Sequence, residues 1–218
     1  RLILFSNSIN RNAETMENYK VYIRSIQNIT PDVLRIVTNK PDGFDFTSGK
    51  ATEIAINKAG WESQKRPFTM TSLPKDDKLE FVIKTYPSHE GVTNELLELK
   101  QNDELLLGDV FGTIDYKGEG VFIAGGAGVT PFISILRQLK ANKEIGLNKL
   151  LFANKSKADI ILEQEFNSLL GDSFINILSE EQIEGYAFGR ITEEFLKENI
   201  ENLKQHFYLC GPPPMITA

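Results

Sequence analysis

The sequence predicts two consecutive domains, an all-β domain followed by an α/β domain built on a parallel sheet. From Met16 to about Tyr116, short β-rich segments are separated by turn residues, whereas after Gly118 short strands alternate with helical patterns. The length of 218 residues, of which 41% are hydrophobic, suffices for two hydrophobic cores. We place the boundary at Tyr116–Glu119, where the stretch Lys-Gly-Glu-Gly offers a flexible joint. The predicted domains are 16–116 and 117–218, after an N-terminal extension at 1–15.

Composition and charge exclude several classes of function. A net charge of −6 without a basic cluster argues against a protein that binds nucleic acid. The single cysteine excludes an internal disulfide and a four-cysteine iron–sulfur or zinc site within this chain, so we expect no metal site. No apolar run reaches transmembrane length, and Arg1–Phe5 is too short for the core of a signal peptide. We therefore expect a cytoplasmic protein in which Arg1–Thr15 precedes a natural start at Met16.

The first domain reads as a series of short strands. β-Branched and aromatic residues recur in four segments, which turn signals rich in proline, aspartate and glycine separate. A short helix at Thr93–Leu99 interrupts this rhythm. Strand spacing of this kind is typical of an antiparallel barrel or sandwich. The predicted strands are Tyr19–Ile26, Val33–Thr38, Thr52–Ile56 and Leu79–Tyr86.

The second domain alternates strands with helices. This alternation predicts a parallel sheet with helices on both faces, because a parallel connection needs a crossover element. The predicted strands are 121–124, 149–153, 173–178 and 206–210, and the predicted helices are 131–141, 158–170 and 192–200.

A glycine-rich turn lies between the first predicted strand and helix of the second domain. It contains Gly125, Gly126 and Gly128, followed by Thr130 and Pro131. Glycines let a ligand approach the bare backbone, and proline suits the first helical position. The free N–H groups of the first helical turn then favour a phosphate or pyrophosphate. The alternative is a turn that only packs closely.

Two stretches of the first domain also carry chemistry. Arg66-Pro67-Phe68-Thr69 offers a guanidinium suited to phosphate, a ring suited to stacking on a planar ligand, and a hydroxyl. The segment Gly91–Thr93 reads as a helix start open to an anion, with Thr93 as the N-cap. The alternatives are an exposed arginine beside a core phenylalanine, and plain helix capping.

The last predicted strand ends in Cys210-Gly211-Pro212. Carboxyl ends of strands in a doubly wound sheet face the ligand crevice, so we expect Cys210 to face the same crevice as the glycine turn. It would position a ligand rather than act as a nucleophile, because no histidine lies beside it in the sequence. Alternatively, Cys210 is a small buried hydrophobe.

Taken in order, these four motifs resemble the signature of ferredoxin–NADP reductase-type flavoproteins, especially bacterial flavodoxin/ferredoxin reductases and oxygenase reductase components. The resemblance covers nearly all of Met16–Ala218. It implies a six-stranded antiparallel barrel that binds FAD and a C-terminal domain that binds a nicotinamide dinucleotide. It also implies an enzyme that passes a hydride from NAD(P)H to the flavin. Single electrons then go to a separate carrier such as flavodoxin or ferredoxin, or to an oxygenase component.

The resemblance also implies roles for individual residues. Arg66 would hold a flavin phosphate, Phe68 would stack on the isoalloxazine, and Thr69 would bond near N5. Gly91, Val92 and Thr93 would cradle the FAD pyrophosphate. Gly126, Gly128 and Thr130 would face the nicotinamide dinucleotide, with Cys210 and Gly211 beside its ring. Thr69 and Cys210 are thus the catalytic candidates, and the other expected cofactor contacts are Pro67, Pro131, Asn154, Lys155, Pro212 and Met215.

Three departures from the family pattern are visible. Phe68 stands where tyrosine is common, and Thr69 where serine is common, although both keep the ring and the hydroxyl. The chain also stops just after Met215, where the family usually continues through a helix and a last strand, so we expect the C-terminal end of the domain to be missing.

The second strand of the α/β domain bears on the choice between NADPH and NADH. An acid at its end would accept a hydrogen bond from the ribose 2′-hydroxyl and repel a 2′-phosphate. Here Asn154 is followed by Lys155-Ser156-Lys157, so no acid is expected at that corner and NADPH is favoured. Alternatively, these lysines form a solvated loop and specificity is set in the loop holding Gly189 and Arg190, or in the C-terminal part that we expect to be missing. Two other functions stay open: an NADH-dependent oxygenase or desaturase reductase, and a nucleotide-binding regulatory subunit without turnover.

Overall fold

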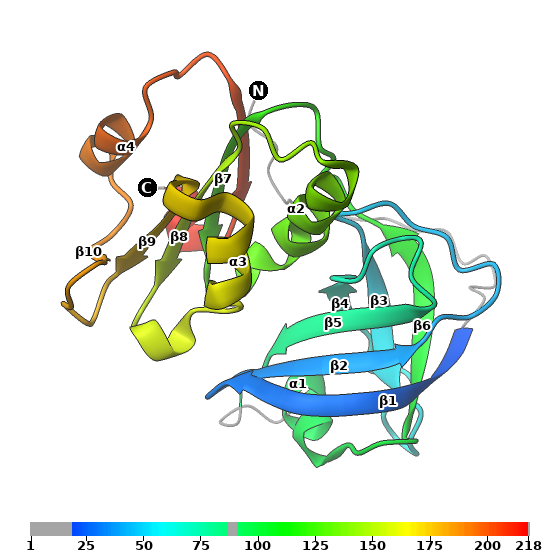
Figure 1. Ribbon diagram of the computed structural model, residues 1–218. Coiled ribbons are helices and arrows are strands. Elements are labelled where there is room, and N and C mark those ends of the chain that lie inside the picture. Colours follow the sequence, from blue (N-terminus) through cyan, green and yellow to red (C-terminus); the bar gives the residue numbers. More distant parts are fainter. Residues whose placement is uncertain (1–18, 87–90, 218) are drawn as a thin grey trace. The chain divides into compact units, whose positions relative to one another are not determined.

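The computed structural model describes residues 19–86 and 91–217, which form two compact units that divide between Thr113 and Ile114 (Figure 1). The expected extension at Arg1–Thr15 lies outside the described residues. The ring of Tyr116 stacks on Phe122 and Tyr208 of the second unit, with centroids 6.3 and 5.8 Å away. The flexible joint expected at Tyr116–Glu119 stays a prediction.

The first unit is a closed antiparallel barrel. Its six strands lie in the order β4-β3-β6-β1-β2-β5, and all their pairings are antiparallel. Met70, directly after β4, bridges Phe81 of β5 and so joins the two edges. The six-stranded antiparallel barrel is thus confirmed. The elements are β1 (Tyr19–Thr30), β2 (Val33–Asn39), β3 (Ala51–Ile56), β4 (Arg66–Thr69), β5 (Lys78–Lys84), α1 (Val92–Glu95), η1 (Leu96–Glu98) and β6 (Glu104–Phe111).

Alternation along the strands fills the barrel core. In β1, Val21 and Ile23 are buried, whereas Tyr22 between them is 47% exposed, because successive side chains of a strand point to opposite faces. Val92 of α1 and Leu96 of η1 pack into the same core. The hydrophobic effect therefore holds the helix start against the barrel.

The second unit is a five-stranded parallel sheet in the order β10-β9-β8-β7-β11. The parallel sheet predicted from the alternating pattern is confirmed. Its elements are β7 (Gly120–Gly125), η2 (Gly126–Val129), α2 (Thr130–Asn142), β8 (Lys149–Asn154), η3 (Lys157–Asp159), α3 (Glu163–Leu170), η4 (Gly171–Ser173), β9 (Phe174–Leu178), β10 (Ala187–Phe188), α4 (Glu193–Asn199), β11 (His206–Cys210) and α5 (Pro213–Ile216).

Helices cover both faces of this sheet. On one face, Phe122 of β7 contacts Phe132 of α2, and Phe152 of β8 contacts Phe166 of α3. The other face buries a cluster that includes Phe195 of α4 and Met215 of α5. Every residue of β7 is buried, as expected of a strand inside a doubly covered parallel sheet.

Two local predictions are corrected by the structure, and one strand of the barrel was not predicted. The helix expected at 158–170 begins only at Glu163, because Ser156 and Asp159 form a capping box around a short turn and the buried Ile161 follows it. The helix expected at Thr93–Leu99 is one turn, α1, followed by η1. Strand β6 was not anticipated, because its Leu105-Leu106-Leu107 run lacks clear alternation in sequence.

Candidate cofactor-binding site

The Arg66–Thr69 motif forms strand β4 of the barrel. Its backbone pairs with β3, with Phe68 opposite Thr52 and Thr69 opposite Ala51. Arg66 is exposed, and its guanidinium donates to the carbonyl oxygen of Lys65 at 2.8 Å. Phe68 and Thr69 are half-buried, and the Phe68 ring packs partly against the barrel core. The structure therefore presents the guanidinium to solvent while the ring is anchored, and Pro67 between them is exposed.

A buried carboxylate braces the chain directly after β4. Glu80 of β5 is 2% exposed, and its carboxylate accepts hydrogen bonds from Arg35 Nε at 2.8 Å and Thr71 Oγ1 at 2.9 Å. The backbone N–H of Glu80 donates to Ser72 Oγ at 3.1 Å. Charge-assisted bonds of this kind restrain the segment that carries the motif. Sequence reasoning missed Glu80, although an acid between apolar neighbours in a strand was a visible signal.

The Gly91–Thr93 segment opens helix α1. Gly91, not Thr93, is the N-cap residue, and no side chain caps the helix, so the expected capping role of Thr93 is wrong. Val92 is buried in the core, where it anchors the turn. A Cβ added at Gly91 would meet no heavy atom within 4 Å, so the turn borders open space.

That space is a pocket of about 430 Å³. Its lining combines one aromatic ring with amide and carboxylate groups from two segments of the barrel unit, and sequence reasoning missed most of it. The lining residues are Trp61, Gln64, Gly91, Asn94 and Glu95. Because Gly91 has no side chain, its backbone is open to the pocket, and an added Cβ would take up part of that space. This arrangement fits a flavin dinucleotide whose pyrophosphate lies against the backbone.

The glycine turn of the second unit joins β7 to α2. Gly126 adopts φ +51°, and a Cβ there would meet nothing within 4 Å. Gly128 instead lies directly against β11: a Cβ added at this position would lie only 2.2 Å from the carbonyl oxygen of Cys210. The hydroxyl of Thr130, expected to face the dinucleotide, donates to the carbonyl of Ala127 at 3.0 Å. Gly126 thus borders open space, whereas Gly128 and Thr130 shape the turn.

Cys210 ends β11 in register with Ala124 of β7, so the structure brings it to the same sheet edge as the glycine turn. Burial raises the pKa of its thiol to about 11, which keeps it protonated and non-nucleophilic at neutral pH. Met215 lies close to two glycines, since added Cβ atoms on Gly125 and Gly211 would each fall 2.7 Å from its thioether end. Pro212 likewise would lie 3.0 Å from a Cβ on Gly125. The side chains of Met215 and Pro212 therefore pack against Gly125, where strand β7 enters the glycine turn.

Asn154 marks the carboxyl end of β8 with an unsatisfied amide. The residue is 8% exposed, and neither its Oδ1 nor its Nδ2 has a hydrogen-bond partner among the described residues. Its backbone carbonyl accepts from the N–H of Ser179 at 3.0 Å. A buried unpaired amide costs about 1–3 kcal/mol. A polar ligand at this edge of the sheet would relieve that cost, which fits a nicotinamide dinucleotide.

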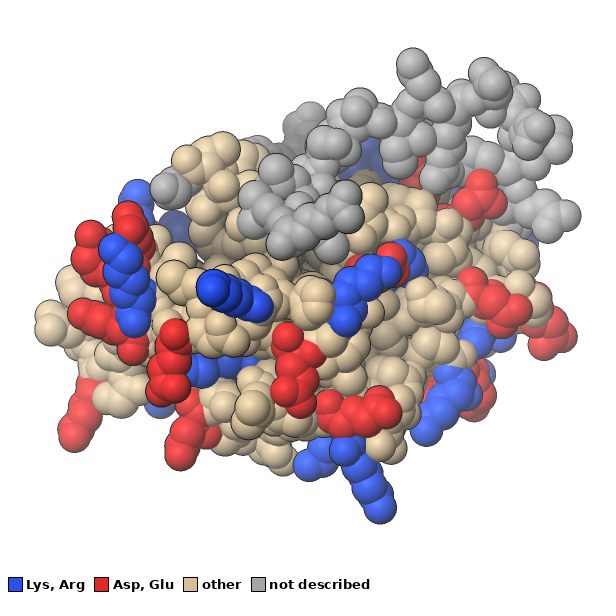
Figure 2. Space-filling model, turned by 90° about the horizontal axis from the view of Figure 1, so that it is seen from above, with Lys and Arg blue, Asp and Glu red and all other residues tan. Residues whose placement is uncertain are grey.

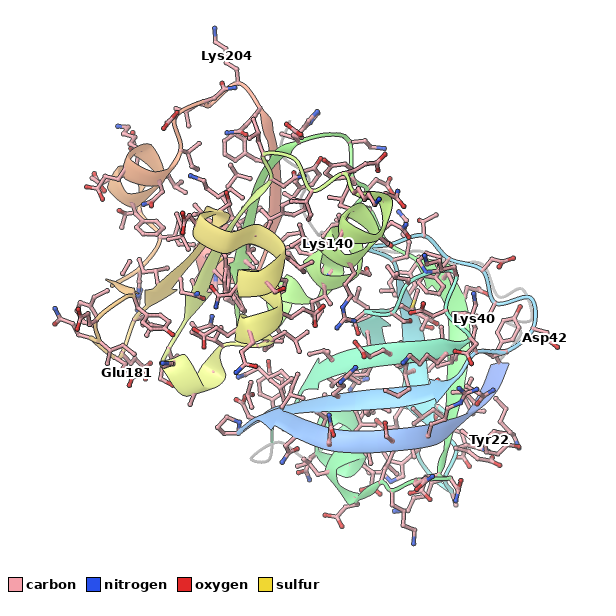
Figure 3. All side chains as sticks on the ribbon, in the orientation of Figure 1. Tyr22, Lys40, Asp42, Lys140, Glu181 and Lys204 are labelled. Carbon is pink, nitrogen blue, oxygen red and sulfur yellow. The ribbon has the colours of Figure 1, made fainter. Side chains whose placement is uncertain are left out.

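Acids do lie at the corner beyond Asn154, so the expectation of none is wrong. Lys155 Nζ lies 3.3 Å from Glu180 Oε1. Glu181, labelled in Figure 3, accepts the backbone N–H of Lys157 with its Oε2 at 2.7 Å. The hydroxyl of Ser156, which lies between the two lysines, donates a hydrogen bond to Asp159 Oδ2 at 2.7 Å. Glu180 and Glu181 follow the third strand of the sheet, so their position could not be read beside the lysines in sequence.

Both signs of charge are mixed on the described part of the face that Figure 2 shows. Basic and acidic side chains are interspersed there, and no continuous basic area of the kind that binds a phosphate backbone is visible among these residues. Within residues 19–86 and 91–217, no helix has the length and apolar character needed to cross a membrane.

Comparison with known proteins identifies both units. Residues 18–143 match the model of an FAD-binding domain, and residues 122–218 match that of an oxidoreductase NAD-binding domain. The reductase component of propane 2-monooxygenase from Mycolicibacterium smegmatis is 29% identical over 93% of this chain, which spans 62% of that relative. The corresponding component from a Gordonia species is 30% identical over 90% of this chain and 60% of its own length. The chain thus spans about three fifths of these relatives.

Solved structures agree on the fold. A ferredoxin NADP⁺ reductase from Neisseria gonorrhoeae, with bound FAD and NADP, has a TM-score of 0.80 at 21% identity, covering 92% of this chain and 87% of that one. The ferredoxin reductase in carbazole 1,9a-dioxygenase also reaches 0.80, at 20% identity, covering 94% of this chain and 64% of that one. Since the FAD-binding model matches more than half of the sequence and the barrel and parallel sheet are those of these structures, this chain belongs to the ferredoxin–NADP reductase-type flavoprotein family.

Proposed function

We propose that this chain is an NAD(P)H-dependent flavoprotein reductase that passes electrons, one at a time, to a separate acceptor protein. The observation that carries this proposal is open space beside a glycine turn in each unit, at Gly91 and at Gly126, in domains that match an FAD-binding and an NAD-binding family. Bound FAD would supply the conversion of a two-electron hydride donor into a one-electron source.

The residues of the barrel would bind and orient the flavin. The exposed Arg66 guanidinium would pair with a flavin phosphate, and the anchored Phe68 ring would offer a face to the isoalloxazine. Thr69 would direct its hydroxyl at the reacting edge. In the second unit, the protonated thiol of Cys210 would position the nicotinamide without forming a covalent bond.

The acceptor is a ferredoxin, a flavodoxin or an oxygenase component. The oxygenase alternative is favoured by one observation, the 29–30% identity over at least 90% of this chain to reductase components of propane 2-monooxygenase. Adding purified candidate acceptors to reduced protein and following their reduction would rank them. A regulatory subunit without turnover would reduce none of them.

A small preference for NADPH over NADH is expected. Lys155 and Lys157 favour a 2′-phosphate, but Glu180 and Glu181 offset part of their charge. The Lys155–Glu180 pair is largely exposed, with side chains 72% and 63% accessible, so its contribution is screened by solvent. An advantage of about 1 kcal/mol or less corresponds to a ratio below about tenfold in kcat/KM.

Steady-state kinetics with both nucleotides test this corner. Lys155→Ala/Lys157→Ala should lower the NADPH to NADH ratio of kcat/KM, whereas Glu180→Gln/Glu181→Gln should raise it. A wild-type preference for NADH, or ratios that neither double variant changes, would place specificity elsewhere, for example in the loop holding Gly189 and Arg190.

The whole proposal is tested by the spectrum of the purified chain. The protein should show flavin absorbance that bleaches on anaerobic addition of NADPH or NADH, and heat should release FAD without a covalent link. Protein that binds no flavin, or a flavin that neither nucleotide bleaches, contradicts the proposed function.

A further inference from the structure

A second cavity lies in the α/β unit, at the amino ends of β7, β8 and β11. The loops that precede these three strands meet there, because neighbouring parallel strands begin at the same edge of a sheet. The glycine turn and Cys210 lie at the opposite, carboxyl edge, where nucleotide ligands of such sheets bind. The cavity has a volume of about 520 Å³, and its lining consists of Glu119, Leu147, Asn202, Lys204, Gln205 and His206. We call these residues, together with Leu203, the amino-edge face.

Two exposed leucines make the amino-edge face apolar. Among the large hydrophobic side chains that the structure describes, Leu147 and Leu203 are the two most exposed, at 83% and 61%. Leu147 lines the cavity, and Leu203 lies between Asn202 and Lys204, which also line it. A single exposed leucine is ordinary, but two beside one cavity form an apolar patch of the kind that marks contact with another protein.

Hydrogen bonds hold the backbone beneath this patch. Asn148, next to Leu147, is buried, and its Oδ1 accepts the N–H of Gly120 at 3.0 Å. In the loop before β11, the N–H of Lys204 donates to Asn202 Oδ1 at 2.8 Å. A surface that is formed before its partner arrives loses little freedom on binding.

The amino-edge face carries one charge of each sign. Glu119 and Lys204 line the same cavity, and neither side chain has an ion-pair or hydrogen-bond partner within residues 19–86 and 91–217. Figure 3 shows the Lys204 side chain extending outward from its loop. A partner of a single charge sign would satisfy only one of these two groups. A second copy of the same face, related by a two-fold axis, would satisfy both, because Glu119 of each copy then faces Lys204 of the other.

We propose that the amino-edge face joins two copies of this chain in a two-fold symmetric dimer. Every contact across such an axis occurs twice, so two pairs of Glu119 with Lys204 flank the leucines of both copies. The exposed leucines of one copy pack against those of the other and leave water, which supplies the driving force. Because the face lies away from the glycine turn and Cys210, the inference does not depend on the proposed function.

Analytical ultracentrifugation of the full chain tests the dimer. The wild type should pass from monomer to dimer between roughly 1 μM and 1 mM, the range expected of a small interface. Leu147→Glu should raise the dissociation constant of the dimer by roughly a hundredfold or more, because each dimer loses two buried leucines. Phe188→Glu is the matched control, since it places the same charge at an exposed apolar side chain on the other edge strand of the sheet, and it should leave the constant unchanged. Thermal unfolding of each variant verifies that it is folded.

Charge reversal tests the pairing itself. Glu119→Lys and Lys204→Glu should each weaken the dimer by roughly tenfold, because two attractive pairs become repulsive. The variant with both reversals should return to within about threefold of the wild-type constant, since the same pairs form again with opposite polarity. The proposal is overturned by a wild type that stays monomeric up to roughly 1 mM, by a Leu147→Glu protein that dimerises like the wild type, or by a double reversal no tighter than the single ones.

Discussion

A single added methyl group at Gly128 should displace the end of strand β11. The Cβ of alanine would lie 2.2 Å from the carbonyl oxygen and 2.6 Å from the carbonyl carbon of Cys210. Non-bonded carbon atoms prefer about 3.5–4.0 Å, so the backbone must move by roughly 1 Å or more. That movement disturbs the pairing of Cys210 with Ala124.

The expected cost can be estimated from this overlap. Overpacking of a closely packed site costs about 1–3 kcal/mol, and each kcal/mol lowers Tm by about 2–4 °C in a protein of this size. Gly128→Ala should therefore lower Tm by roughly 2–12 °C and raise KM for the nicotinamide nucleotide. Differential scanning calorimetry and steady-state kinetics measure the two effects.

Gly91→Ala is the matched control for this prediction. Gly91 has an extended backbone, with φ −174°, and a Cβ there would meet nothing within 4 Å. The flavin-free variant should melt like the wild type, yet bind flavin less tightly because the methyl group enters the space left for the ligand. If the Gly128→Ala protein has the same Tm as the wild type, the close contact between the glycine turn and β11 is refuted.

The other predictions concern single groups. Arg66→Ala should weaken flavin binding far more than Phe68→Leu. The first variant loses a charge-assisted pair with a phosphate, whereas leucine keeps much of the buried apolar area. Equal flavin content of the two variants after gel filtration would contradict these roles. Glu80→Ala should lower the free energy of unfolding, measured in urea, by about 3 kcal/mol. This is the low end of the range for a broken buried ion pair, because the remaining Arg35 keeps access to solvent. An effect near zero would exclude the bracing role. Cys210→Ser should slow the reduction of the flavin by NADPH, followed by stopped flow, while flavin content stays unchanged. An unchanged rate would mean that the thiol only packs as a small buried hydrophobic group. Because the pKa of Cys210 is raised from 9.0 to about 11, its contribution to stability should be present below pH 9 and fade as pH rises toward 11, a loss that Cys210→Ser should not show.

Much of the fold is encoded locally. Strand periodicity with turn residues in the first half, and alternation of strands and helices in the second, predicted the two architectures because each pattern reflects burial within one element. The glycine turn after β7 was also visible, since a positive φ and a close backbone approach both require the residue type itself. The order of the four motifs then pointed to the family.

Contacts between distant segments were decided only by the tertiary structure. The barrel closes where Met70 meets Phe81, and the brace next to the Arg66–Thr69 motif joins Glu80 to Arg35. The carboxylate of Glu165 in α3 likewise pairs with Arg137 of α2 at 2.5 Å. The partners lie 11 to 45 residues apart in sequence, and side-chain type alone does not specify which distant segment will face a residue.

The candidate site shows the same division. Arg66, Gly91 and Cys210 were predicted from sequence, and the structure places them on strand β4, at the start of α1 and at the end of β11. Trp61 was not predicted to lie there, since a lone tryptophan in a loop lines this pocket only when folding sets it beside the turn at Gly91. The acids at the nucleotide corner escaped notice for a related reason. Glu180 follows a different strand from Lys155, and only the parallel pairing of β8 with β9 brings their strand ends together.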